Sequence, residues 1–318
     1  MKDHEQHQRL SGGSVSWFRR FMAVVRYELL WNIRKKKFIG VIIIAFLLAV
    51  LGLVLPLVLS ESIPKNAHFA ITYGADGLSL FLFALAIAMN SMSSEFESGT
   101  IVPLLTKPVS RTTVFLGKVF AAFAILLVSF TVIFTFTAVG SIFVYGPQSD
   151  LVLLPVVLLG NIISAFIWVS ILIAMGTITK NTILTVIISL GLFISLFIAL
   201  PVVSVFVGPS TALNYLPGTG ATGELITADN TPLSVGAGTD YLGVNLVYAL
   251  LYSGQSVNFS KIDIWTVQVG DQTLPTTEVL YTESINFVAI RGLAISLTYI
   301  AVFLLIGWLA FKKTQINE

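Results

Sequence analysis

Long apolar runs separated by short polar segments dominate the chain. About 20 consecutive apolar residues are enough to cross the hydrocarbon core of a bilayer as a helix. Six runs have this length: Phe38–Leu59, Ala70–Ser93, Thr113–Tyr145, Leu151–Thr177, Thr182–Val207 and Phe287–Phe311. The pattern predicts an all-α integral membrane protein with six transmembrane helices, five of them within residues 38–207 and the sixth within 287–318, which also holds the C-terminus.

The polar and apolar positions before the first run follow a different pattern. Residues 1–16 are polar and contain glycine and serine, which predicts a disordered tail. Within residues 17–37, apolar side chains such as Trp17 and Phe21 share one side of a helical wheel, and basic ones such as Arg26 and Arg34 take the other. This predicts a cytoplasmic interfacial amphipathic helix whose arginines face lipid headgroups or a partner. An ordinary helix packed on its own protein would show the same pattern.

Composition agrees with a membrane protein. Hydrophobic residues make up 56% of the 318 and charged residues only 11%, whereas soluble domains carry about 25% charged residues. The absence of cysteine excludes disulfides and thiolate metal sites, and the three histidines have no partner at metal-ligand spacing. A net charge of +2 is too small to suggest nucleic acid as a partner.

Basic residues set the expected orientation, because cytoplasmic loops carry an excess of lysine and arginine. A cytoplasmic N-terminus places most of them inside: Arg34 to Lys37, Lys107, Arg111, Lys118, Lys180, Lys312 and Lys313. Only Lys65, Lys261 and Arg291 fall outside, and Arg291 is expected to reach the membrane surface from the outer end of the last helix. We therefore expect both termini in the cytoplasm.

Residues 208–286 form an enlarged extracellular segment between the fifth and sixth helices. Its start is rich in glycine, proline and threonine, and Tyr241–Tyr252 can form a short helix. Ile262–Val269 alternates like a strand and is followed by a turn at Gly270 and Asp271. Asn258 begins a glycosylation acceptor tripeptide, which is a weak signal.

The charged segment between the second and third runs contains a predicted helix stop. The helix that enters it can continue to Glu97, where Ser98 and Gly99 end it. Glycine adopts the left-handed conformation of a helix C-terminus without a steric penalty. The chain is therefore expected to change direction at Gly99.

A second, short helix is predicted directly after this stop. Thr100 can cap a helix over residues 101–107, and Pro108 ends it, since the residue before a proline disfavours the α conformation. Ser110 can then cap the next long helix. The segment 94–108 is thus predicted to lie across the membrane surface, although a plain charged loop could also occupy this place.

The chain shows no chemistry of its own that could drive transport. The central parts of the apolar runs contain no aspartate, glutamate, lysine or histidine, whereas ion-driven carriers keep such groups at mid-membrane. Neither a nucleotide-binding loop nor a catalytic constellation is found in the sequence. We expect a non-catalytic chain without a cofactor of its own, whose energy comes from another subunit.

These motifs resemble the signature of the permease subunits of type-2 ABC transporters. The matching residues are Glu95-Phe-Glu97-Ser-Gly99-Thr100, Leu104-Leu105, Lys107-Pro108-Val109-Ser110-Arg111 and Gly117-Lys118, with Tyr27-Glu28-Leu29 and Arg34 on the first helix. The resemblance implies that segment 94–108 is a coupling helix docking on a separate ATP-binding subunit, which carries ATP and Mg. It also implies a second permease chain, hence a homodimer, in the plasma membrane of a prokaryote.

The resemblance gives each site residue an expected role. Glu97, Gly99 and Thr100 hold the turn, while Glu95, Lys107 and Arg111 supply polar contacts to the partner. Two further sets of residues have an expected role. Pro108 and Lys118 are expected to take part in coupling to the ATPase. The interfacial helix is expected to contact membrane lipids through Trp17, Phe21, Arg26, Glu28 and Arg34.

Two functions fit these features. The first is the permease subunit of an ATP-driven exporter of a hydrophobic or amphipathic substrate. The alternative is a non-transporting membrane scaffold or assembly protein that recruits an extracellular partner through residues 208–286.

Overall fold

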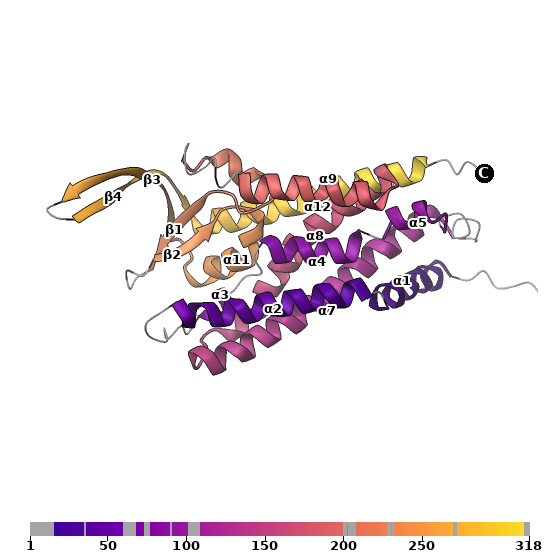
Figure 1. Ribbon diagram of the computed structural model, residues 1–318, viewed down its shortest axis with the longest axis horizontal. Helices are drawn as coiled ribbons and strands as arrows, with labels where there is room; N and C mark the ends of the chain where they lie inside the picture. Colours follow the sequence, from indigo (N-terminus) through magenta and orange to yellow (C-terminus); the bar gives the residue numbers. More distant parts are fainter. Residues whose placement is uncertain are drawn as a thin grey trace, which may run out of the picture.

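The protein is an elongated helical bundle with a small β-sheet at one end (Figure 1). This computed structural model describes residues 16–34, 36–59, 68–72, 77–89, 91–100, 109–199, 202, 208–227, 230, 232–269 and 272–314. The sheet lies at the left end in Figure 1, and α1, α5 and the C-terminus lie at the right end, which we call the α5 end.

The amphipathic helix and the first apolar run form α1 (Trp17–Ile33) and α2 (Lys36–Leu59). The Ser16 side chain accepts a hydrogen bond from the Arg19 N–H and so caps α1. Helix α7 (Arg111–Tyr145) comes after the charged segment 94–108 in the chain and is capped in the same way by Ser110, as predicted. Both α1 and α2 pack against α7, with α1 beside its first turns (Figure 1).

The second apolar run is interrupted, contrary to the expected single helix that continues to Glu97. It forms α3 (Phe69–Thr72), α4 (Gly77–Ala88) and α5 (Ser93–Glu97). The turn between α4 and α5 includes Ser91, whose carbonyl accepts a hydrogen bond from the buried Lys118 ammonium. A carbonyl directed at a lysine in this way is taken out of the helical ladder.

Three more long helical segments complete the bundle. The first is α8 (Leu154–Thr179), which follows the turn η1 (Leu151–Leu153). The second is α9 (Thr182–Ile194), which continues into the π-helical turn η2 (Ser195–Ala199). The third is α12 (Ile285–Lys313), the last helix of the bundle. Helix α8 is central, and its Trp168 is 1% exposed. The Trp168 ring packs edge-on against Phe81 of α4 and Phe193 of α9, which themselves stack at 4.3 Å.

Four segments of the described chain are long and apolar enough to cross a membrane. They are Gly77–Glu97 (α4, α5 and the turn between them), Arg111–Tyr145, Leu151–Thr179 and Ile285–Lys313. Helix α2 has 24 residues, and a shorter apolar helix covers Thr182–Ile198. The protein is therefore a multi-pass membrane protein, and the count of six spans stays a prediction.

The segment between α9 and α12 contains a four-stranded antiparallel sheet, of which the sequence predicted only one strand. After η3 (Thr211–Tyr215) come β1 (Thr222–Ile226), β2 (Pro232–Gly236), η4 (Thr239–Tyr241), α11 (Leu242–Leu251), β3 (Ser256–Val269) and β4 (Gln272–Ser284), with strand order β2-β1-β3-β4. Helix α11 and strand β3 match the helix and the strand expected here. The predicted turn at 270–271 lies outside the described residues. The all-α description thus holds for the bundle and not for this segment.

The sheet packs onto α11 and the start of α12 through a second apolar core. Phe259 of β3 and Val257 are fully buried there, together with Val288 of α12. Beyond this core the β3–β4 hairpin projects away from the bundle (Figure 1).

Arg291 of α12 does not reach outward as expected. It is only 6% exposed, and its Nη1 donates to Glu283 Oε1 at 2.6 Å. Its guanidinium also lies 5.1 Å from the Phe287 ring centroid. Glu283 at the end of β4, whose side chain is 14% exposed, holds the arginine inside the protein, because an unpaired buried charge would be costly.

Candidate functional site

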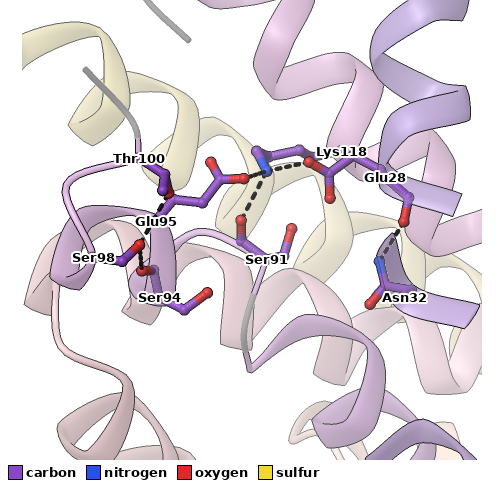
Figure 2. Close-up of polar contacts among 8 residues, drawn as sticks. All are labelled: Glu28, Asn32, Ser91, Ser94, Glu95, Ser98, Thr100 and Lys118. Carbon is purple, nitrogen blue, oxygen red and sulfur yellow. Dashed lines mark hydrogen bonds and ion pairs between the residues drawn. The ribbon is translucent and has the colours of Figure 1, made fainter. Parts of the chain in front are cut away.

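Three charged side chains from distant parts of the chain meet at the α5 end. Lys118 of α7 is 1% exposed, and its Nζ donates to Glu28 Oε1 of α1 at 2.5 Å and to Glu95 Oε1 of α5 at 2.6 Å. Its third hydrogen bond goes to the Ser91 carbonyl at 2.9 Å. Figure 2 shows both carboxylates and this carbonyl converging on the ammonium. We call Glu28, Glu95 and Lys118 the charged triad.

The triad uses all the hydrogen-bonding capacity of the lysine, which carries three donors and no acceptor. The Glu28 and Glu95 side chains are 3% and 14% exposed. Two carboxylates and one ammonium leave a formal charge of −1 in a nearly water-free place. Each member therefore depends on the others, because removing one partner of a buried pair leaves an uncompensated charge.

Glu28 is itself held in place by the helix that carries it. Asn32 of α1 is 5% exposed, and its Nδ2 donates to the Glu28 carbonyl at 3.0 Å. Val24 and Val25 lie on the same buried face of α1, where a Cβ at Gly117 of α7 would come within 2.7 Å of Val24. Close backbone approach at Gly117 thus brings α1 near enough for Glu28 to reach Lys118.

Helix α5 is attached to two further helices. Glu97 Oε2 accepts a hydrogen bond from the Thr182 backbone N–H at 3.3 Å, at the start of α9. The Phe96 ring packs edge-on against Phe311 of α12 at 6.2 Å, and the Lys180 ammonium lies 5.8 Å from the centroid of the Phe96 ring. These five residues of α5 therefore contact α7, α9 and α12 at once.

The turn after α5 has the conformation that the sequence predicted. Gly99 has a φ of +70°, in the left-handed region. The Ser98 hydroxyl donates to the Ser94 carbonyl at 2.6 Å and lies 3.0 Å from the Thr100 hydroxyl (Figure 2). The short helix expected over 101–107, with Lys107 and Pro108, lies outside the described residues.

Glu95 and Arg111 make contacts within the chain, where contacts to a partner were expected. The Glu95 carboxylate is bound by Lys118, as described above. The Arg111 Nη1 donates to the carbonyls of Lys312 at 3.0 Å and Thr314 at 2.7 Å. Arg111 thus binds the last carbonyls of α12, where cations are favoured. Any role of these two residues in coupling stays a prediction, and it would act through the position of α5 and α7.

Of the remaining residues expected on α1, Trp17 and Phe21 contact α7, and Arg26 and Arg34 lie on the exposed side of α1. Trp17 Nε1 donates to Thr113 Oγ1 at 3.0 Å, and Phe21 packs edge-on against Phe120 of α7 at 5.7 Å. Arg26 and Arg34 are exposed. Arg26 and Arg34 therefore lie on the exposed face of α1, while Glu28 joins the buried face.

Sequence reasoning missed the carbonyl of Ser91, the support from Asn32 and the contact with Thr182. A backbone carbonyl freed by a helix break leaves no residue-type signal, and Glu28 and Lys118 are 90 residues apart. The sequence signal for the charged triad was that Glu28, Glu95 and Lys118 all match the family signature. That match did not indicate that the three side chains contact each other. Within the described residues, no group of histidine, aspartate and glutamate could hold a metal ion.

Comparison with known proteins agrees with this layout. No curated protein matches the chain. The profile of the ABC-2 family transporter proteins matches residues 22–316, from α1 through the charged triad to the end of α12. The chain therefore belongs to the ABC-2 transporter family and is a membrane-spanning permease component of an ABC transporter.

Proposed function

We propose that this permease works in an ATP-driven exporter and receives its driving force at the α5 end. A separate ATP-binding subunit docks on α5 and the residues that follow it to Pro108. Transport of a hydrophobic or amphipathic substrate then takes place between this chain and a second permease chain.

The observation that carries the proposal is the attachment of α5 to the bundle through Lys118. A push on α5 acts directly on α7 through Glu95 and on α1 through Glu28, which share the same ammonium. The contacts of Glu97 and Phe96 extend the push to α9 and α12. A short helix at the surface, fixed to four other helices, is suited to transmit force into the membrane.

The other parts of the proposal follow from charge and family membership. ATP and Mg bind on the partner subunit, and the second permease chain is a copy of this one. Few charged groups line the interior of the described part of the bundle, which favours a hydrophobic or amphipathic substrate over a small ion. Basic residues at the α5 end favour the cytoplasmic face of a prokaryotic plasma membrane, with both termini on that side.

Cysteine cross-linking tests the docking surface, because the chain has no cysteine of its own. Ser98→Cys places a thiol on an exposed residue of the turn, and Ser253→Cys places the control on an exposed residue at the sheet end. After purification of the tagged chain with its partners in mild detergent, a short thiol–amine cross-linker should join Ser98→Cys to a co-purified ATPase. Recovery of an active ATPase that is cross-linked equally by both variants, or by neither, would contradict docking at α5.

The projecting β3–β4 hairpin supports a second candidate, a scaffold that recruits an outer partner. A hairpin that extends beyond its own apolar core offers strand edges and side chains to another protein. Under this alternative the purified chain carries no ATPase under conditions that preserve other membrane complexes. Co-purification of an ATPase in stoichiometric amount would exclude the scaffold function.

A further inference from the structure

The guanidinium of Arg291, at the sheet end of α12, is buried but makes only one hydrogen bond to the described residues. The side chain is 5% exposed, and its Nη1 donates to Glu283 Oε1 at 2.6 Å. A guanidinium carries five N–H donors and no acceptor. Its Nε and Nη2 are also buried, and no described residue accepts a hydrogen bond from either atom. Because unpaired donors in a buried place are costly, these two nitrogens require an acceptor.

Glu283 carries an unpaired acceptor in the same place. Its Oε1 is bound by Arg291, while its Oε2 is buried and accepts no hydrogen bond from the described residues. A bidentate contact, which arginine and carboxylates often form, would have paired Oε2 as well. The two side chains instead leave two donor nitrogens and one carboxylate oxygen for a third group. Their formal charges cancel, so a third group that is neutral overall keeps the site balanced.

Two aromatic rings lie beside the guanidinium and are half exposed. The guanidinium carbon is 5.1 Å from the centroid of the Phe287 ring and 5.8 Å from that of Tyr215 in η3. Phe287 and Tyr215 are 50% and 53% exposed. The Tyr215 carbonyl accepts a hydrogen bond from the Tyr299 hydroxyl at 2.9 Å, which fixes the backbone of η3 to α12. Exposed side chains change rotamer within nanoseconds, so a ligand can reach Arg291 by moving a ring while the backbone stays in place.

The pair of Arg291 and Glu283 lies near the depth of a headgroup layer. Helix α12 is long and apolar enough to cross the membrane, and Arg291 follows its first residue by about 9 Å at 1.5 Å per residue. One polar headgroup layer is about 5–8 Å thick. Phe287, Ile290 and Leu297 form an exposed apolar face at helical spacing on the same helix. A molecule that approaches the pair from this face therefore comes from the lipid.

We propose that Arg291 and Glu283 bind the headgroup of a zwitterionic phospholipid with a primary ammonium. The phosphate accepts hydrogen bonds from Nε and Nη2 of Arg291, because the planar fork of a guanidinium matches two oxygens of a phosphate. The ammonium donates to Glu283 Oε2 and so pairs the remaining carboxylate oxygen. This headgroup is neutral overall, whereas a headgroup with a net charge would bring an uncompensated charge into a buried place. The site does not depend on an ATPase partner.

Three phospholipids with the same acyl chains separate these interactions in the wild-type protein. The full chain is reconstituted in nanodiscs with equal amounts of phosphatidylethanolamine, phosphatidylcholine and phosphatidylglycerol, extracted in mild detergent, and examined by native mass spectrometry. Phosphatidylcholine has the phosphate but no N–H donor, and phosphatidylglycerol has no ammonium. One phosphatidylethanolamine should be retained at least about tenfold more often than either of the others, because each of them lacks the hydrogen bond to the carboxylate.

Two conservative variants with matched controls assign the preference to the pair. Glu283→Gln keeps the size of the side chain and should lower the preference for phosphatidylethanolamine over phosphatidylcholine by about tenfold. Glu224→Gln, at an exposed position of the same sheet, should leave the preference unchanged. Arg291→Lys keeps the charge but loses the two-nitrogen fork, and it should lower retention of phosphatidylethanolamine by about fivefold. Arg26→Lys, at an exposed position of α1, should not.

A photolabel and a soluble competitor keep the test independent of the folding of the variants. Phosphatidylethanolamine with a diazirine in its acyl chain should label wild-type peptides containing residues 287–297. Soluble phosphoethanolamine has the same headgroup without acyl chains and should displace the lipid only in large excess. Displacement by an equal concentration of phosphoethanolamine would assign the site to a soluble zwitterion and overturn the proposal. Equal retention of the three lipids, an unchanged preference in Glu283→Gln, or labelling spread evenly over α7 and α12 would each overturn it as well.

Discussion

Removing the Lys118 ammonium should destabilise the protein more than any change at an exposed lysine. In Lys118→Met a side chain of similar length replaces the lysine, while Glu28 and Glu95 remain. Their side chains are 3% and 14% exposed, and the Ser91 carbonyl also loses its donor. Breaking a buried ion pair from one side costs about 3–5 kcal/mol, which corresponds to a fall in Tm of about 6–20 °C.

The assay is thermal melting of the purified protein in detergent, followed by intrinsic fluorescence. Lys313→Met is the control because Lys313 is exposed and lies at the same end of the molecule; it should change stability by less than about 0.5 kcal/mol. The triple variant Glu28→Gln, Glu95→Gln and Lys118→Met should recover much of the loss, since neutral groups replace the unpaired charges.

Two results would refute this reasoning. Melting of Lys118→Met at the wild-type temperature would show that the carboxylates find other compensation. A triple variant no more stable than Lys118→Met would show that packing, and not charge, makes the lysine important.

Three other predictions follow from single contacts. Gly99→Leu places a side chain at a φ of +70°, which costs about 1–2 kcal/mol. It should uncouple ATP hydrolysis from transport in the reconstituted complex while membrane insertion stays intact. Unchanged coupling would contradict a role of the Gly99 turn in coupling. Arg111→Gln removes the donor to the last carbonyls of α12 and should speed tryptic cleavage after Lys312, whereas a wild-type rate would mean that the α12 end is held by other contacts. Burial raises the pKa of the Tyr248 phenol from 10.0 to about 12. The stability that this shift contributes is therefore complete below about pH 10 and is lost as the pH rises toward 12. Tyr248→Phe should flatten the fall in melting temperature over that range, and an equally steep fall in both proteins would exclude this residue as its cause.

Local patterns in the sequence predicted most of the long helices and several of their ends, although not the break between α4 and α5. A long apolar run has few stable alternatives to a helix in a membrane, because each backbone polar group must find its partner within the segment. Ser110 caps α7 as predicted, and Gly99 takes the left-handed conformation. These features depend on residues within one or two turns of each other, so they can be read without the tertiary structure.

In residues 208–286, sequence patterns were weaker indicators of secondary structure. The strands β1 (Thr-Gly-Glu-Leu-Ile) and β2 (Pro-Leu-Ser-Val-Gly) contain glycine and proline, which are depleted in strands. They are stabilised by pairing with each other and by the packing of Leu225 and Val235 on α11 and α12. Such strands exist through tertiary contacts and leave little signal in the sequence.

The charged residues show most clearly what the sequence by itself determined and what only the tertiary structure decided. The sequence determined a polytopic helical protein with basic residues concentrated at one end, and it selected Glu28, Glu95 and Lys118 by their resemblance to a family signature. The family resemblance suggested that Glu95 faces a partner. Arg291 was expected to reach the membrane surface, because a long basic side chain near the end of an apolar run can extend to water. The structure buries Lys118 between two carboxylates and pairs Arg291 with Glu283. A charge can be buried only when distant segments bring a counter-charge and hydrogen-bond partners to it, and that arrangement is a property of the folded chain.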